Sequence, residues 1–84
     1  MTPTEQRVAA IFAEFIGVAI VTQDDDLFSL GGDSHHLVLI ALELEYEFSI
    51  EMPVDTLGEL GTVAKAAAWI DGQAKTTSGD AAPH

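Results

Sequence analysis

One short stretch of the chain combines residue types that could take part in covalent chemistry. It reads Gly-Gly-Asp-Ser over residues 31–34 and is followed at once by His35 and His36. A serine hydroxyl can act as a nucleophile when an imidazole accepts its proton. A serine at a helix start, after a flexible glycine pair, is also a hydroxyl that another enzyme's active site can reach. Besides a nucleophile and a hydroxyl that another enzyme modifies, Ser34 could be an ordinary serine near a helix start, where this residue is common.

The order of these residues argues against catalysis by the chain itself. Neighbouring helical residues point in different directions, so neither His35 nor His36 can easily act as the base for Ser34. The nucleophile elbow of hydrolases needs a glycine two residues after the serine, and that residue is His36. A chain of 84 residues also leaves little room for a triad and an oxyanion hole. We therefore expect no catalytic residues and no enzymatic activity.

Two patterns raise the question of a metal site, and neither fits one. The adjacent histidines diverge on a helix, and no third ligand is evident. Counted from Asp24, an EF-hand loop needs an acidic or amide residue and then glycine at its fifth and sixth positions, which here are Phe28 and Ser29. We predict no metal, and expect Asp25 and Asp26 to solvate the loop and cap its turns.

The elements that would position this serine are helices. Thr2 can cap the first one, Pro3 suits its first position, and Glu5 stands where a capping box needs it. Its apolar residues follow helical spacing and comprise Val8, Ile11, Phe12, Phe15 and Ile16. Gly17 should end it, near residue 16 or 17. We interpret the apolar run 18–21 as the end of this helix and the start of a packed loop, because a lone strand is not stable.

A long loop over residues 17–33 should lead into a second helix, from Ser34 to about Phe48, with Asp33 as its cap. Apolar residues would pin the loop to the core, namely Leu27, Phe28 and Leu30. The helix's inward face would comprise Leu37, Ile40, Ala41, Leu44 and Phe48, widened by Val38, Leu39, Leu42 and Tyr46. Its glutamates, Glu43, Glu45 and Glu47, are expected to form a solvated face.

A short third helix should open at Pro53 and reach about Leu57, and Gly61-Thr62 should stop it and cap the last helix. That helix should run from Val63 to about Asp71 and end at Gly72. Its inward residues would be Val63, Ala66, Ala67 and Ile70, with Trp69 beside them. Trp69 and, on the second helix, Tyr46 are expected to be core or core-edge aromatics. The predicted fold is all-α, a small bundle of three main helices plus one short helix. Residues 1–73 would form the domain, and residues 74–84 a disordered tail.

The stretch around the serine closely resembles the core sequence of carrier domains from nonribosomal peptide and polyketide synthesis. It reads DDLFSLGGDS over residues 25–34. The segment IEMP at 50–53 resembles the family's link after its second helix, and LGELGTVA at 57–64 resembles its entry into the last helix. About residues 5–71 fit the family, and the resemblance implies an acyl-carrier-protein-like bundle.

In that family the serine after the Gly-Gly-Asp step carries a phosphopantetheine arm, which implies that Ser34 is the attachment point. A phosphopantetheinyl transferase, using magnesium and coenzyme A, would attach the arm, whose thiol would hold an acyl, aminoacyl or peptidyl group as a thioester. A phosphodiester is favoured at a helix N-terminus. Gly32 and Asp33 would border the arm. The predicted partner contacts are Leu30, His35, Leu37, Val38 and Glu43.

The resemblance also implies partners. These are an adenylating or acyl-loading enzyme and downstream synthase or tailoring enzymes of secondary metabolism, such as antibiotic biosynthesis. Two features depart from the family. His35 and His36 replace the usual apolar residues after the serine, and glutamates replace basic residues frequent on the second helix of modular peptidyl carriers. The acidic helix and the chain's own Met1 favour a discrete carrier. A housekeeping fatty-acid carrier, with its usual shorter Asp-Ser-Leu context, ranks second.

Composition limits the remaining possibilities. The 84 residues allow one domain, and fourteen acidic against three basic residues give a formal net charge of −11. Such a surface repels nucleic acid and anionic lipid and favours partners with basic patches. The chain has no cysteine and no run near the ~20 apolar residues of a membrane span. Residues 1–6 lack the basic start and apolar middle that a signal peptide would show. We expect a cytoplasmic monomer with no nucleic-acid or membrane partner. The alternative of another class is an unmodified acidic adaptor, which would need no serine at residue 34.

Overall fold

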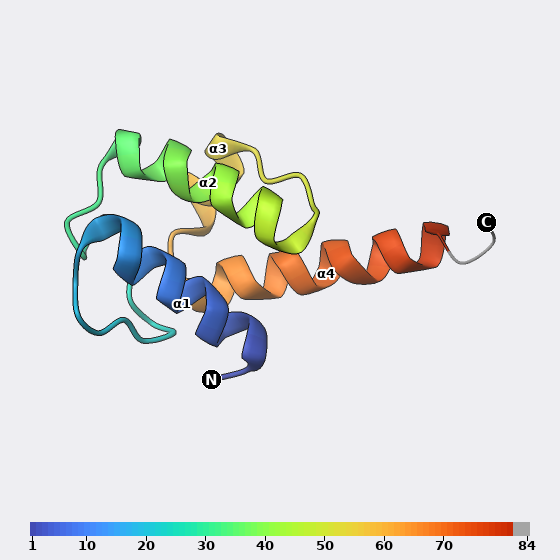
Figure 1. Cartoon of the computed structure of the whole chain (residues 1–84), viewed down its shortest axis with the longest axis horizontal. Coiled ribbons are helices and arrows are strands. Elements are labelled where there is room, and N and C mark those ends of the chain that lie inside the picture. The colour runs from blue at the N-terminus through green and yellow to red at the C-terminus, as the bar shows by residue number, and fades with distance from the viewer. Residues whose placement is uncertain (82–84) are drawn as a thin grey trace.

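Over residues 1–81, a computed structural model shows four helices, which are α1 (Pro3–Ile16), α2 (Ser34–Phe48), α3 (Val54–Leu60) and α4 (Val63–Ala81) (Figure 1). The structure describes the backbone of residues 1–81 and the side chains of residues 1–73. Three helices are long and α3 is short, so the predicted all-α bundle is confirmed. In the described part of the chain, no helix has both the length and the apolar character to cross a bilayer.

Helix α1 begins and ends where its capping residues predict. The Thr2 Oγ1 accepts a hydrogen bond from the backbone N–H of Glu5 at 3.1 Å, and the Glu5 carboxylate accepts one from the Thr2 N–H at 2.8 Å. Gly17 follows the last turn with a φ of 88°, which is left-handed and favours glycine. The helix stops before the run 18–21, so assigning that run to its end is wrong. The run is loop, and Val21 is buried in the core.

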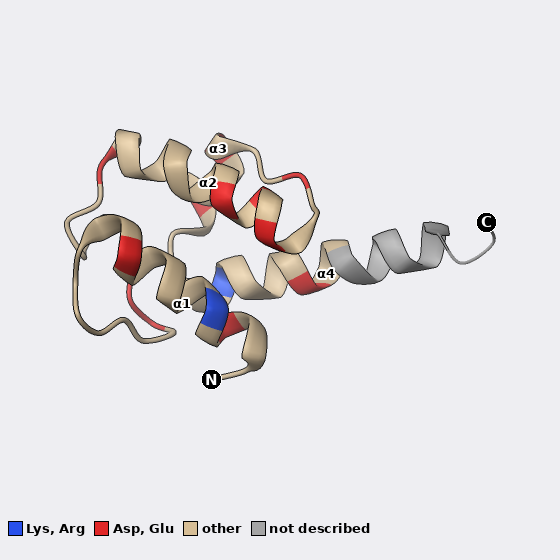
Figure 2. Cartoon of the chain, viewed as in Figure 1, with Lys and Arg blue, Asp and Glu red and all other residues tan. Residues whose placement is uncertain are grey.

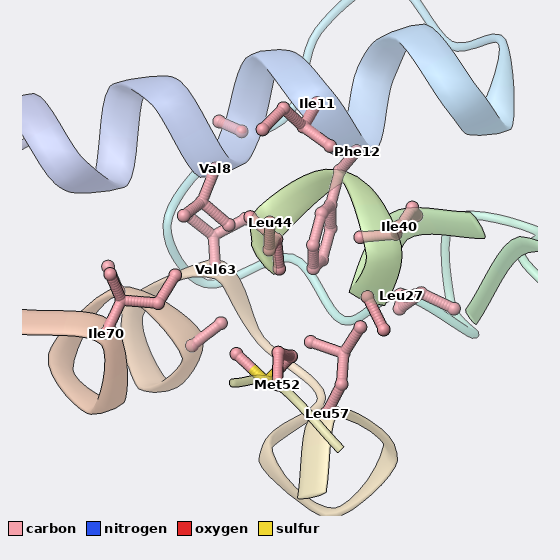
Figure 3. Packing of buried hydrophobic residues seen from close by; sticks show 14 of the residues in the cluster. Val8, Ile11, Phe12, Leu27, Ile40, Leu44, Met52, Leu57, Val63 and Ile70 are labelled. Atoms are coloured by element: carbon pink, nitrogen blue, oxygen red, sulfur yellow. The ribbon is translucent and has the colours of Figure 1, made fainter. Parts of the chain in front are cut away.

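One hydrophobic core joins all four helices to the loop that precedes α2 (Figure 3). Figure 3 shows Phe12 of α1 facing Ile40 and Leu44 of α2, with Leu57 of α3 below them. The inward residues predicted for α2 and α4 are buried or packed against this cluster, and Trp69 lies at its edge as predicted. The buried residues are Val8, Ala9, Ile11, Phe12, Val21, Leu27, Leu37, Ile40, Ala41, Leu44, Met52, Leu57, Val63, Ala66, Ala67 and Ile70.

The opposite side of α2 is exposed, which corrects the expectation that further apolar residues widen its buried face. Tyr46 is 83% exposed and Leu42 57%, and Val38 and Leu39 are also on the surface. The reason is that α2 packs against α1 and α3 along one face. Hydrophobic residues around more than half of a helix do not reveal which of them its neighbours will cover.

Two of the three α2 glutamates tie elements together and do not form a solvated face. Glu47 pairs with Arg7 of α1, and Glu45 accepts a hydrogen bond from the backbone N–H of Met52 at 2.8 Å. Both are half-buried, so the solvated-face prediction is wrong for them. Figure 2 shows other acidic residues spread over α1, α2 and the loops.

Helix α3 is longer than predicted. It begins at Val54, directly after Pro53, and extends to Leu60. Gly61 ends it with a φ of 74°, and the Thr62 Oγ1 accepts a hydrogen bond from the Lys65 N–H at 3.2 Å in the first turn of α4. The predicted stop and cap at this junction are therefore confirmed.

Helix α4 also extends beyond its predicted end near Asp71. Its backbone continues through Gly72 to Ala81. Gly72 does not adopt a positive φ, and glycine inside a helix costs only about 1 kcal/mol relative to alanine. The predicted disordered tail over residues 74–84 lies outside the residues whose side chains are described, and it stays a prediction.

Candidate functional site

Ser34 is the first residue of α2, immediately after its cap Asp33. Its side chain is exposed, and within the described residues no hydrogen bond engages the hydroxyl. A helix N-terminus carries backbone N–H groups without intrahelical partners and the positive end of the helix dipole. A free hydroxyl at this position is accessible to another protein's active site, and an anionic group joined to it would be stabilised.

Asp33 caps the helix as predicted. Its Oδ1 accepts hydrogen bonds from the backbone N–H of His35 at 3.0 Å and of His36 at 3.1 Å. The bond from the His36 N–H is the main reason that the pKa of the Asp33 carboxyl lies below its ordinary value, and the nearby His36 side chain and the His35 N–H act in the same direction. Desolvation opposes this lowering of the pKa. The carboxylate is therefore ionised at neutral pH beside Ser34.

The two glycines before Asp33 have different structural reasons to be glycine. Gly31 has a φ of 98°, which strains any residue with a side chain. Gly32 is packed closely, because a Cβ there would lie 2.6 Å from the Leu27 Cδ2 and 2.8 Å from the Leu27 carbonyl oxygen. The Gly32 N–H donates to that same carbonyl at 3.0 Å. Gly32 therefore holds the chain against the buried Leu27 just before Asp33 and Ser34.

The acidic residues of the loop cap its turns, as predicted. The Asp26 Oδ1 accepts hydrogen bonds from the backbone N–H of Phe28 at 2.9 Å and of Ser29 at 3.4 Å. The Asp25 carboxylate accepts one from the Thr22 N–H at 2.8 Å. These bonds fold the loop locally. In the described side chains, no group of three or more His, Cys, Asp or Glu residues is arranged to hold a metal ion.

The loop is also tied to the distant junction between α3 and α4, which the sequence did not reveal. The Leu27 N–H donates to the Gly61 carbonyl at 2.9 Å, and the Val63 N–H donates to the Asp25 carbonyl at 3.3 Å. A Cβ on Gly61 would lie 2.4 Å from the Asp26 Oδ2, so glycine is needed there. The loop before Ser34 is therefore anchored in two ways, by backbone hydrogen bonds to the α3–α4 junction and by the buried side chain of Leu27.

Some of the predicted partner-contact residues lie on the surface, and one lies in the core. His35 and Val38 are exposed, and Leu30 and Glu43 are half-buried. Leu37 is only 8% exposed and packs under α3, where a Cβ on Gly58 would lie 3.3 Å from its Cδ2. Leu37 thus belongs to the core, because it lies on the face of α2 that α3 covers. Phe28 is exposed as well, so of the loop residues expected to pin the core only Leu27 is fully buried.

Sequence reasoning gave no structural role to His36. Its Nδ1 accepts a hydrogen bond from the Asp33 N–H at 3.2 Å, so His36 completes a capping box at the start of α2. The signal was its position three residues after the cap. Glu or Gln usually occupies that position, and histidine does not suggest the same role.

Comparison with known proteins decides the family. The model of the family described as "Phosphopantetheine attachment site" matches residues 6–70, most of the chain. The chain belongs to this family. It is a carrier protein of the phosphopantetheine-dependent type, as the sequence predicted, and members of the family bear the arm as a covalent group.

Individual relatives include parts of large synthetases and small carriers of similar length. The chain is 36% identical over 78 residues to a linear gramicidin synthase of Brevibacillus parabrevis, covering 93% of this chain and 2% of that protein. It is 34% identical over 74 residues to an acyl carrier protein of Zymomonas mobilis, covering 84% of this chain and 95% of that protein.

A solved structure agrees with the fold. BlmI, a type-II acyl carrier protein from Streptomyces verticillus involved in bleomycin biosynthesis, superposes with a TM-score of 0.78 and 32% identity. The match covers 82% of this chain and 83% of BlmI.

Proposed function

We propose that Ser34 is the residue that carries the phosphopantetheine arm. The observation that supports this most directly is its hydroxyl, which is exposed and, among the described residues, free of hydrogen bonds at the first residue of α2. The surroundings fit the group. The backbone around Gly31 is open, with no atom within 4 Å of a Cβ placed there, and the start of the helix favours a phosphodiester.

In the attachment reaction the Ser34 Oγ would form a bond to the phosphorus next to the pantetheine of coenzyme A. The pyrophosphate P–O bond would break, the adenosine bisphosphate would leave, and the hydroxyl proton would pass to a base of the transferase. Once attached, the arm would supply a thiol that holds acyl cargo as a thioester. The chain's own task is to present the hydroxyl. The capped helix start and the packed glycine at residue 32 perform it by fixing the backbone on both sides of Ser34.

The chain itself would catalyse nothing. His36 is engaged with Asp33, and the rings of His35 and His36 lie 6.2 Å apart at 68° to each other. Neither imidazole has a hydrogen bond to the Ser34 hydroxyl in the described part of the chain. The activating base would therefore belong to the partner enzyme.

For the pathway, we propose a carrier of secondary metabolism that takes aminoacyl, peptidyl or polyketide cargo. The likeness to gramicidin synthase and to a carrier of bleomycin biosynthesis supports this assignment. A fatty-acid carrier is the second candidate, supported by the match along 95% of the Zymomonas acyl carrier protein. The partners would be a phosphopantetheinyl transferase, an adenylating or acyl-loading enzyme and downstream enzymes. The net charge of −11 favours basic contact surfaces on them.

The test is the intact mass of the purified chain after incubation with coenzyme A, magnesium and a broad-specificity phosphopantetheinyl transferase. We expect a gain of one phosphopantetheine in the wild type and in Ser29→Ala, which removes an exposed serine of the same loop, and no gain in Ser34→Ala. No gain in folded wild-type protein with several transferases would overturn the proposal and favour an unmodified adaptor.

A further inference from the structure

We propose that His36 is a positioning residue for attachment of the arm, because it fixes the backbone that carries Ser34. This inference rests on the proposed role of Ser34. His36 is half-buried, and its Nδ1 accepts a hydrogen bond from the Asp33 N–H at 3.2 Å. The Asp33 carboxylate in turn accepts the His36 N–H at 3.1 Å. The two reciprocal bonds join Asp33 to His36 and close a ring that includes the backbone of Ser34, which lies between them in the chain.

The contact between His36 and Asp33 is available in both charge states of the imidazole. When Nδ1 is unprotonated it accepts the Asp33 N–H, and when it is protonated it can donate to the Asp33 Oδ1, which lies 3.0 Å away. The ionisable groups placed against His36 are Asp33 and the neighbouring His35 ring. Asp33 is therefore the partner of His36 with or without a proton on Nδ1, and the bond from the Asp33 N–H belongs to the unprotonated form.

The consequence for Ser34 follows from chain connectivity. The Asp33 N–H and carboxylate are both held by His36, and Gly32 is packed against Leu27 on the other side. The peptide units on either side of Asp33 are then fixed, and the direction of the next side chain is fixed with them. Without the imidazole, the Asp33 N–H loses its acceptor and the first turn of α2 can fray. The transferase would then meet the Ser34 hydroxyl in several orientations.

The chain offers a matched control at its other capping box. Glu5 of α1 makes the same kind of side-chain bond, to the Thr2 N–H at 2.8 Å, on a helix start that carries no proposed chemistry. Glu5→Ala therefore removes an equivalent cap contact from the same fold. A loss of attachment that came only from general destabilisation would appear in this variant too.

The experiment compares His36→Ala, His36→Gln and Glu5→Ala with the wild type. The kcat and KM of a phosphopantetheinyl transferase are measured with each as the protein substrate. The NMR chemical shift of the Asp33 amide is recorded for each, because it reports the bond without any enzyme. We expect His36→Ala to raise the KM by about two- to tenfold, the effect of one hydrogen bond, and to shift the Asp33 amide. Glutamine is a usual residue at this cap position, so His36→Gln should restore most of both values. Glu5→Ala should change neither.

Two results would overturn the inference. One is a His36→Ala variant with an unshifted Asp33 amide and unchanged kinetics, while the wild type is modified normally. The other is an equal loss in Glu5→Ala, which would assign the effect to overall stability. Failure of the proposed function looks different, since the wild type itself would then gain no mass, and the positioning role would fall with it.

Discussion

Helices α1 and α2 both begin with a capping box, but the two boxes serve different purposes. Both have a capping box, formed by Thr2 and Glu5 in α1 and by Asp33 and His36 in α2. In α1 the device serves the bundle, and the nearby Thr4 Oγ1 donates to Asp71 of α4 at 2.7 Å. In α2 it frames an exposed serine that makes no such bond within the described residues.

The approach to each helix also differs. Met1 and Thr2, which come directly before α1, are exposed. The start of α2 follows a loop held by the α3–α4 junction and by Leu27. Local capping therefore explains where each helix begins. Tertiary anchoring of the preceding loop explains how rigidly a side chain at the start of the helix is held.

The largest effect is expected from filling the space at Gly32. A Cβ in Gly32→Ala would meet Leu27 at 2.6 Å, and overpacking of this kind costs typically about 1–3 kcal/mol in the free energy of unfolding. Urea denaturation measures the loss, and attachment at Ser34 should slow because the loop must move. Gly72→Ala is the control. A Cβ added at residue 72 would have no described atom within 4 Å, and the substitution should stabilise the chain by up to about 1 kcal/mol.

The next largest effect concerns the cap of α1, which should matter for stability and not for arm attachment. Thr2→Ala removes the cap of α1 and should lower the free energy of unfolding by about 1 kcal/mol. The rate of arm attachment should stay the same, because α1 is not the helix that presents the serine. Thermal unfolding and transferase kinetics measured on one preparation check both statements. A slower attachment in this variant would show that the two starts are coupled.

The smallest effect is a pH dependence expected at the start of α2. The pKa of Asp33 lies below its ordinary value of 3.8, chiefly because the carboxylate accepts the His36 N–H. The ionised form therefore stabilises the folded chain above pH 3.8, and this contribution is lost as the pH falls through the lowered pKa.

Asp33→Asn keeps a good cap and removes the titration. The difference in unfolding free energy between wild type and this variant should shrink as the pH falls below 3.8. Denaturation curves at several pH values measure it. A difference that stayed constant through the acid range would show that the Asp33 charge adds nothing to the cap.

Much of the fold was predictable because its signals are local. Thr2, Asp33 and Gly61 mark helix ends through hydrogen bonds to residues a few positions away, and the structure confirms all three. The side of α2 that carries Leu42 and Tyr46 was assigned wrongly, since the exposure of those residues depends on where α1 and α3 pack.

At the candidate site, too, the local features were predictable from the sequence and the long-range contacts were not. The Gly-Gly-Asp-Ser stretch pointed to Ser34, and the acidic residues of the loop were expected to cap its turns. The bonds from the loop to Gly61 and Val63 join segments that lie far apart along the chain, and no local pattern encodes them. His36 was missed for a different reason, because histidine is an unusual residue for a capping box.

Fragmentation mass spectrometry of the modified chain would locate the phosphodiester and so test the role of Ser34 directly. We expect a single modified residue, Ser34, which has an exposed side chain and begins α2. Finding the arm on another residue, such as Ser29 in the same loop, or finding no modified peptide in folded protein, would contradict it.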